Sequence, residues 1–328
     1  MKKTLFLLLA ACAVSTASAA EYWVKGVNQS GGWFDTNKTG NNDSGFCWAA
    51  ADTNILSWWY QQNKAASKVA DENDIPNTQE EIWDLYNSAF ENSTGHPGGG
   101  LRWYMTGEKP QSTLKETETA KGAYYKNGDV TADITNINMF SYEPWVWDAN
   151  EGLYIIDKSQ VDPQRDVYLL IANDLREYIT HGYIIALGVA EYQNKRSYQH
   201  AVTLWGIETD DTTWHLTRMW VTDSDDALYK LDDGQTLKYG DGLICIDCSD
   251  STLDVGFLED SDKLKSIGLT SSTRGPNNDI WYDFETKSSY IYDYTTIKLT
   301  SNIEVPEPTT ATLSLLALAG LAARRRRK

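Results

Sequence analysis

The chain reads Ser44-Gly-Phe-Cys47-Trp-Ala-Ala-Ala-Asp-Thr-Asn-Ile-Leu-Ser-Trp-Trp-Tyr60 where a lone cysteine opens an apolar segment. Apolar side chains recur every four residues from Cys47 to Trp59, which predicts one apolar face of a helix. Ser44 is its predicted N-cap. The unpaired amides and the positive dipole end of a helix start favour a thiolate over a thiol. A cysteine in an apolar run is also commonly an inert core residue, so chemistry has to be argued from the rest of the chain.

The composition indicates a folded globular protein. Of 328 residues, 41% are hydrophobic and 12% aromatic, enough to build a sizeable core in one large domain or two. No linker, internal repeat or low-complexity block in the sequence requires a second domain. The formal net charge is -17, and it becomes -23 once the seven basic residues and one acidic residue of the two ends are removed. Such a surface repels nucleic acid, so we expect no nucleic-acid partner.

Both ends of the chain carry targeting features. Residues 1–20 have the charged start, short apolar run and small-residue site of a secretory signal peptide, although the residues before Cys12 also allow a lipoprotein signal. The tail, residues 305–328, combines Val-Pro-Glu-Pro with a short apolar run and a terminal arginine cluster. That run is shorter than the roughly 20 residues that span a bilayer, so the tail is interpreted as a processing signal. Residues 21–304 form the predicted domain.

Three cysteines remain beyond the signal peptide: Cys47, Cys245 and Cys248. An odd number in an exported protein leaves at least one thiol outside a disulfide unless two chains pair. Cys245 and Cys248 could form a local disulfide or half of a metal site, but no second CxxC or nearby histidine pair completes a zinc set. If those two pair, Cys47 is the remaining thiol.

The periodicity of the chain predicts helices and strands of one α+β domain. A glycine-rich stretch, residues 95–100, is interpreted as a loop that carries His96, and His181-Gly182 closes the second long helix. Three consecutive strands, with a hairpin connection at 193–198, should form an antiparallel sheet. The predicted helices cover 47–60, 80–90 and 163–180, and the predicted strands cover 21–28, 183–192, 199–207 and 214–221, with further β structure in 227–301.

Three residues supply the groups that cysteine protease chemistry needs. That chemistry uses a thiolate, an imidazole that moves the proton, a group that orients the imidazole and donors for the oxyanion. Cys47 offers the thiolate, His200 lies at the head of one strand, and Asp223 follows the next strand. Neighbouring antiparallel strands can bring the last two side by side. His215 is interpreted as a surface histidine of the third strand.

Several runs in family order give the chain a specific resemblance. It resembles the IdeS/Mac family of immunoglobulin-cleaving cysteine proteases, which are papain-like in fold. The matching runs are Tyr22-Trp-Val-Lys-Gly-Val, Gly32-Trp-Phe-Asp-Thr-Asn-Lys-Thr, Cys47 to Lys64, His200-Ala-Val-Thr-Leu-Trp-Gly and Val221-Thr-Asp-Ser-Asp225. The tail resembles a PEP-CTERM sorting signal, which implies export in a Gram-negative bacterium to the medium or cell surface.

The resemblance implies a role for each matching residue. Cys47 would be the nucleophile, His200 the general base and acid, and Asp223 the residue that orients His200. Lys38 would donate to the oxyanion beside the Cys47 amide, and Asp225 would be a supporting acid. The implied fold is papain-like, with the nucleophile at the start of a central helix packed on an antiparallel sheet, and no cofactor or metal is expected.

The resemblance implies peptide-bond hydrolysis more firmly than it implies a substrate. Residues 71–160, where substrate-gripping loops would lie, show no clear match, so immunoglobulin is one candidate among host proteins. We expect a protein substrate, and contact with a membrane only through the tail during export. The alternative function is that of a surface-displayed binding protein that does not catalyse a reaction. The 13 tryptophans and 19 tyrosines of the chain would suit a binding face. Transglutaminase-like acyl transfer would use the same three residues.

Overall fold

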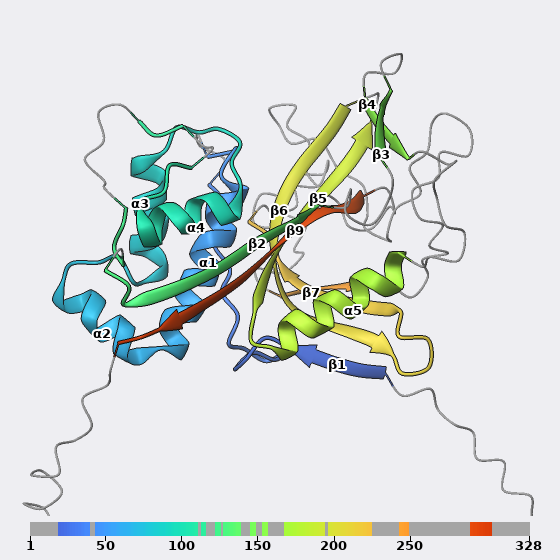
Figure 1. The fold of residues 1–328 in the computed structure, drawn as a ribbon, viewed down its shortest axis with the longest axis horizontal. Helices are drawn as coiled ribbons and strands as arrows, with labels where there is room; N and C mark the ends of the chain where they lie inside the picture. The colour runs from blue at the N-terminus through green and yellow to red at the C-terminus, as the bar shows by residue number, and fades with distance from the viewer. Residues whose placement is uncertain are drawn as a thin grey trace, which may run out of the picture.

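The computed structural model describes most of the predicted domain, together with Ala19 and Ala20 from the end of the predicted signal peptide. The described residues are 19–39, 43–110, 113–115, 122–125, 127–138, 145–148, 153–156, 167–193, 196–224, 243–248 and 289–303. Within them, four helices gather on one side, and a sheet with a fifth helix lies on the other (Figure 1). The helices are α1 (Cys47–Gln62), α2 (Lys64–Glu72), α3 (Gln79–Ala89), α4 (Pro97–Thr106) and α5 (Val167–Thr180).

An antiparallel arrangement of the described strands forms the other layer. The described strands of the main sheet follow the order β2-β9-β5-β6-β7-β8, with β1 paired to the far part of β6, and every pair is antiparallel. They are β1 (Ala19–Trp23), β2 (Val130–Asn138), β5 (Ile184–Gln193), β6 (Arg196–Asp210), β7 (Leu216–Thr222), β8 (Ile244–Asp247) and β9 (Ser289–Ser301). A separate pair joins β3 (Trp145–Asp148) to β4 (Leu153–Ile156). The predicted α+β class and antiparallel sheet are therefore confirmed.

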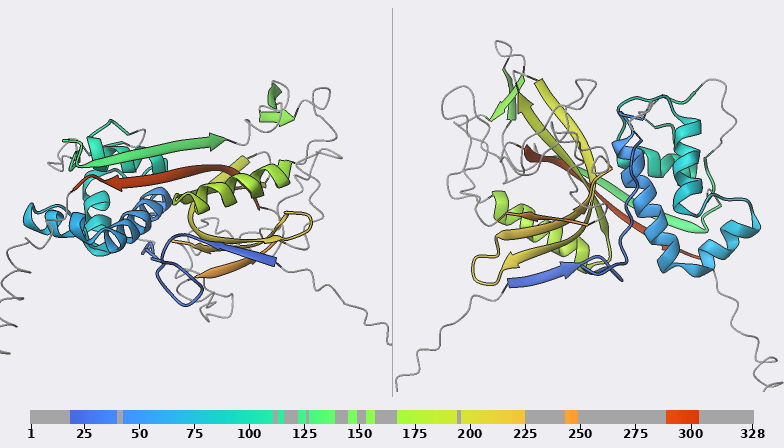
Figure 2. Two further views of the ribbon diagram at one scale, coloured as in Figure 1. Left: turned by 60° about the horizontal axis from the view of Figure 1, so that its bottom comes forward. Right: turned by 180° about the vertical axis from the view of Figure 1, so that it is seen from behind.

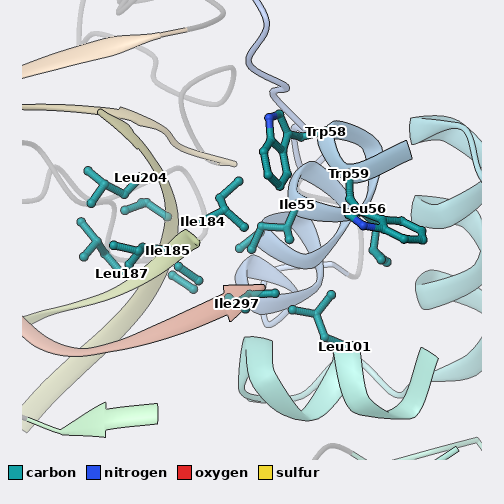
Figure 3. Packing of buried hydrophobic residues seen from close by; sticks show 14 of the residues in the cluster. Ile55, Leu56, Trp58, Trp59, Leu101, Ile184, Ile185, Leu187, Leu204 and Ile297 are labelled. Carbon is teal, nitrogen blue, oxygen red and sulfur yellow. The ribbon is translucent and has the colours of Figure 1, made fainter. Parts of the chain in front are cut away.

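Helix α1 is the centre of the molecule. All its residues from Trp48 to Tyr60 are buried, the polar ones included. Figure 3 shows Ile55 of α1 facing Ile184 of β5, with Ile297 of β9 and Leu101 of α4 close by. Helices α3 and α4 pack on its other side, so α1 lies between the sheet and these helices (Figure 2). The apolar stripe seen in the sequence is one part of a helix that has no solvent face.

Aromatic side chains fill the space between α1, α3 and α4. The Trp48 ring meets Tyr86 and Phe90 edge to face at centroid distances of 5.6 and 5.1 Å, and Phe90 meets Trp103 at 4.7 Å. Such pairs are worth about 0.5–1.5 kcal/mol each beyond the area that they bury. The Trp48 indole also donates to the carbonyl of Ser93. This cluster fixes the start of α1 against the loop that follows α3.

Three predicted element boundaries are wrong. The N-cap of α1 is Phe46, without a side-chain cap, because the Ser44 hydroxyl instead faces the Asn92 amide at 3.4 Å. The glycine run 95–100 is not all loop: α4 begins at Pro97, and the His96 Nδ1 accepts a hydrogen bond from the Gly98 amide as N-cap. The third strand begins at Leu216 and not at Trp214, which has a left-handed φ of 62° in a turn.

The remaining predicted elements form with small shifts. Helices at 47–62, 79–89 and 167–180 are present, and Gly182, with φ of 82°, follows the last of them as predicted. β1 ends at Trp23, earlier than expected, because the chain then turns back through Gly26 and Val27. β5 and β6 both extend into the predicted 193–198 connection, so His200 is the fifth residue of β6 and not its head. In the described part of the chain no helix is long and apolar enough to cross a membrane.

Candidate active site

Two neighbouring strands bring His200 and Asp223 together. His200 lies in β6 and Asp223 directly follows β7, its antiparallel partner. The His200 Nε2 donates to the Asp223 Oδ1 at 2.6 Å, and the two side chains are 3% and 0% exposed. Since a carboxylate only accepts, this bond places a proton on Nε2 and leaves Nδ1 as the nitrogen for proton exchange. The pairing expected from the sequence is thus present in the structure.

Cys47 is the first residue of α1 and is partly buried. The turn before it is built by Asp43, whose carbonyl accepts from the Phe46 amide and whose carboxylate accepts from Thr39. Asn92, from the loop after α3, accepts the Gly45 amide at 2.7 Å. Hydrogen bonds of Asp43 and Asn92 therefore fix the turn that precedes Cys47. The Cys47 amide lies in the first turn of a 16-residue helix, where backbone amides have no partner within the helix.

Lys38 connects the two ends of the candidate site. Its backbone amide donates to the carbonyl of Ser224, the residue after Asp223, at 2.8 Å. Its ammonium donates to the carbonyl of Ser44, in the turn before Cys47, at 3.0 Å. The side chain is buried, so one lysine length separates the end of β7 from the start of α1. An oxyanion contact of Lys38 stays a prediction.

Asn54 ties α1 to the same two strands, and sequence reasoning missed it. Its amide donates to the Thr203 hydroxyl of β6 and to the Thr222 hydroxyl of β7, both at 3.2 Å. Its carbonyl accepts from the Thr36 hydroxyl at 2.7 Å. Asn54 lies seven residues, about two helical turns, after Cys47 and therefore on the same face of α1. A polar residue at that spacing within an apolar helix is the signal that could have found it.

Asp52 is a second buried polar residue of α1. Its side chain is completely buried, and within the described residues neither oxygen meets hydrogen-bond geometry. Burial raises the pKa of the Asp52 carboxyl well above 3.8, and the nearby Tyr86 hydroxyl opposes this rise as the smaller influence. A Cβ on Gly100 of α4 would stand only 2.1 Å from Oδ2, so glycine is required where α4 crosses α1. Asp52 is therefore a buried carboxyl with a raised pKa at the contact of the two helices.

Some sequence-predicted positions cannot be placed. Asp225 lies outside the described residues, as does the side chain of Cys245, so the pairing of Cys245 with Cys248 stays a prediction. Cys248 itself is 1% exposed. His215 precedes β7 and is only partly buried, near the surface as expected. Among the described residues no group of three His, Cys, Asp or Glu side chains could hold a metal ion.

Comparison with protein families separates the chain into matching and unmatched parts. Residues 18–95 match the Mac 1 family. This match covers Lys38, Cys47 and Asn54, whereas His200 and Asp223 lie beyond it. Residues 304–328 match the PEP-CTERM protein-sorting motif. The resemblances to the Mac family and to a PEP-CTERM signal are confirmed over these stretches, and no curated protein matches the chain.

The two matches carry coarse functional information. The Mac 1 match relates the first part of the domain to IdeS-like proteases. The PEP-CTERM match indicates an exported protein of a Gram-negative bacterium. The segment that matches the Mac 1 family holds the predicted nucleophile, Cys47. The buried pair of His200 and Asp223 lies on β6 and directly after β7, outside that match.

Proposed function

We propose that this protein is an exported cysteine endopeptidase of papain-like fold that hydrolyses peptide bonds of protein substrates. The observation that carries the proposal is the buried His200–Asp223 hydrogen bond of 2.6 Å. It occurs in a chain whose Mac 1 segment starts its central helix at Cys47. Nucleophile, base and orienting acid are the three parts of a cysteine protease mechanism.

In the proposed first step, the Cys47 thiol gives its proton to the Nδ1 of His200. The thiolate then attacks the carbonyl carbon of the scissile peptide bond, and the carbonyl π electrons move to the oxygen. The Cys47 backbone amide, at the start of α1, and the Lys38 ammonium are the proposed donors to that oxyanion. Lys38 already reaches the turn before Cys47, where its ammonium binds the Ser44 carbonyl.

In the second step, the tetrahedral intermediate collapses. The C–N bond breaks, and the imidazolium of His200 gives its proton to the leaving amine, which leaves a thioester on Cys47. Water then attacks the thioester carbonyl carbon while His200 takes a proton from it. The C–S bond breaks, the acid product leaves, and the Cys47 sulfur takes the proton back from His200. Asp223 holds the ring through Nε2 in both steps, so that Nδ1 keeps its direction. Asp225 is proposed as a supporting acid.

The first test is the rate of Cys47 alkylation by iodoacetamide from pH 4 to 9, followed by mass spectrometry. We expect rapid alkylation already at pH 5, because a thiolate–imidazolium pair persists below the usual titration range of a cysteine. His200→Ala should abolish this acid-range reactivity. His181→Ala, which changes a histidine at the end of α5, is the matched control.

Two outcomes would contradict the proposal. Alkylation that rises only near pH 8.5, alike in wild type and His200→Ala, would mean an ordinary thiol. Hydrolysis of a denatured protein substrate that survives Cys47→Ala would exclude Cys47 as nucleophile. Tight binding of a protein without cleavage would favour the binding-protein alternative, and product masses would distinguish amine transfer from hydrolysis.

A further inference from the structure

A second histidine–aspartate pair lies beside the first. His96, the N-cap of α4, places its Nε2 at 3.5 Å from the Oδ2 of Asp293 in β9. The side chains are 25% and 14% exposed, so both reach solvent, unlike the buried His200–Asp223 pair. Neither residue has a role in the mechanism above.

The strand register places Asp293 close to His200. Asp293 pairs with Gly188 of β5, which in turn pairs with Ala201 of β6, the neighbour of His200. Two strand spacings amount to about 10 Å. A bulge interrupts the β5–β9 pairing between Gly188 and Val189, and bulges commonly re-aim side chains next to active sites. Paired residues share one face of the sheet, so the Asp293 side chain lies on the face of Gly188 and Ala201. Ile297, four residues further along β9, is on the same face and packs against α1, the helix that begins at Cys47.

Gly188 leaves the room that the Asp293 carboxylate occupies. A Cβ at Gly188 would come within 1.8 Å of the Asp293 Oδ1, so the carboxylate lies over the backbone of β5. Any other residue at 188 would displace it. The carboxylate is thus directed from β9 across β5, toward the strand that carries His200.

His96 turns its Nε2 toward the Asp293 carboxylate. The His96 Nδ1 accepts the Gly98 amide at 3.2 Å, which leaves Nε2 as the ring nitrogen that faces Asp293. The Thr295 hydroxyl lies 3.5 Å from the same Nε2. No lysine or arginine among the described residues forms an ion pair with Asp293. Asp293 therefore presents a partly exposed negative charge.

The loop before α4 joins this pair to the nucleophile. At one end, Asn92 accepts the Gly45 amide and Ser93 accepts the Trp48 indole, on either side of Cys47. At the other end, His96 faces Asp293. Five residues thus span from the turn at Cys47 to the acidic side chain, a length that a bound peptide segment could follow.

We propose that Asp293, beside His96, is a specificity-determining residue that accepts a lysine or arginine side chain of the substrate near the bond that Cys47 attacks. The inference rests on the proposed function and adds a substrate class to it: peptides with a basic residue close to the scissile bond. A partly buried carboxylate without a cationic partner in the described chain favours such a side chain through a charge-assisted hydrogen bond.

The test uses peptidyl acyloxymethyl ketones that differ only in one side chain: lysine, norleucine or glutamate at each position near the ketone. The Cys47 thiolate displaces the carboxylate leaving group and forms a thioether, so labelling is read by mass spectrometry without turnover. At one position the wild type should react at least fivefold faster with lysine than with norleucine. Asp293→Asn should bring this ratio close to one, and Asp293→Lys should favour glutamate. Asp84→Asn, an exposed carboxylate of α3, should keep the wild-type ratio.

The outcomes separate this inference from the proposed function. If Cys47 is labelled in a His200-dependent manner but wild type and Asp293→Asn show the same lysine-to-norleucine ratio at every position, the inference is wrong and the proposed function stands. If no probe labels Cys47 faster than an ordinary thiol, the proposed function fails and the inference fails with it.

Discussion

At the scale of single residues, Asp223 decides how the imidazole of His200 is presented. The carboxylate is fully buried and accepts a hydrogen bond from the His200 Nε2. An amide at this position can donate to Nε2 and so stabilise the wrong tautomer, with the proton on Nδ1. The resemblance to the protease family predicted both partners of this bond. The strand pattern of the sequence also placed them near each other, His200 in one strand and Asp223 after the next.

Asp223→Asn should lower kcat by up to about 10⁴-fold, the loss found when the orienting aspartate of a serine protease is replaced by asparagine. KM should change much less, because the side chain is buried and does not reach a substrate. The measurement is steady-state hydrolysis of a fluorogenic peptide across pH 4 to 9. A thermal melt of the variant serves as the control for folding. A kcat within threefold of wild type would contradict the orienting role.

Asp52 gives the protein a pH-dependent stability of unusual sign. Burial raises the pKa of its carboxyl in the folded state above the 3.8 of an exposed aspartate, so the folded protein binds a proton that the unfolded chain releases. The free energy of unfolding contributed by this group is therefore fully present below pH 3.8 and is lost as pH rises toward the folded pKa.

Asp52→Asn should remove that component of the pH dependence. Relative to wild type, the variant should gain stability as pH rises above 3.8 toward the folded-state pKa of Asp52, because asparagine has no proton to lose. Urea unfolding at several pH values measures the difference, and the exposed Asp84→Asn is the matched control. Parallel curves for wild type and Asp52→Asn would show that Asp52 does not titrate differently in the two states.

At the scale of elements, α1 is fixed to the sheet by polar bonds as well as by its core side chains. Asn54 bridges hydroxyls of β6 and β7 beside the candidate site. Asn54→Ala should lower the free energy of unfolding by about 1–3 kcal/mol, because it leaves buried hydroxyls of Thr36, Thr203 and Thr222 with fewer partners. It should also slow iodoacetamide labelling of Cys47 at pH 5, as α1 and the strands lose their register.

Chemical denaturation and the labelling rate measure these two effects of Asn54→Ala. Ser57→Ala is the matched control, since the Ser57 hydroxyl donates only to Thr53 within α1. If both variants are equally destabilised and label alike, Asn54 does not connect the helix to the site.

The elements also show which parts of the fold the sequence could predict. The helix at Cys47 and the strands around His200 follow from local periodicity. That Asn54 and Asp52 are buried does not, because their neighbours Thr203, Thr222 and Gly100 are distant in sequence. Gly98 and Gly100 were predicted to lie in a loop because glycine has a low helix propensity. They are helical because α4 passes close to α1, a contact between distant parts of the sequence.

Other features of the structure could not be predicted from local sequence patterns either. Trp214 fits a strand by composition, yet the Asp210 carboxylate binds the Thr212 and Thr213 amides and shapes a turn that Trp214 enters with a left-handed φ. The His96–Asp293 pair joins residues nearly 200 positions apart and carries no motif. Family resemblance identified Lys38, but only the structure shows its two anchors at Ser44 and Ser224.

At the scale of the whole molecule, the main sheet depends on a strand from the last part of the domain. β9, from the last part of the domain, lies between β2 and β5 and pairs with both along most of its length. A chain that ends at residue 288 should therefore not fold cooperatively, whereas a chain that ends at residue 303 should. Circular dichroism melts of the two truncations measure this. A cooperative transition in the shorter chain would show that β2 and β5 close the sheet without β9.

The place of β9 also bears on when an exported chain can complete its fold. A chain crosses a membrane from its N-terminus onward, and the helices and β5–β7, with Cys47, His200 and Asp223, emerge long before residues 289–303. Contacts of such large sequence separation form slowly. The sorting motif starts at residue 304, directly after the last hydrogen-bonded residues of the sheet. Completion of the fold and arrival of the sorting motif at the membrane thus fall in the same interval, so we expect the proposed active site to be complete only when the motif has emerged.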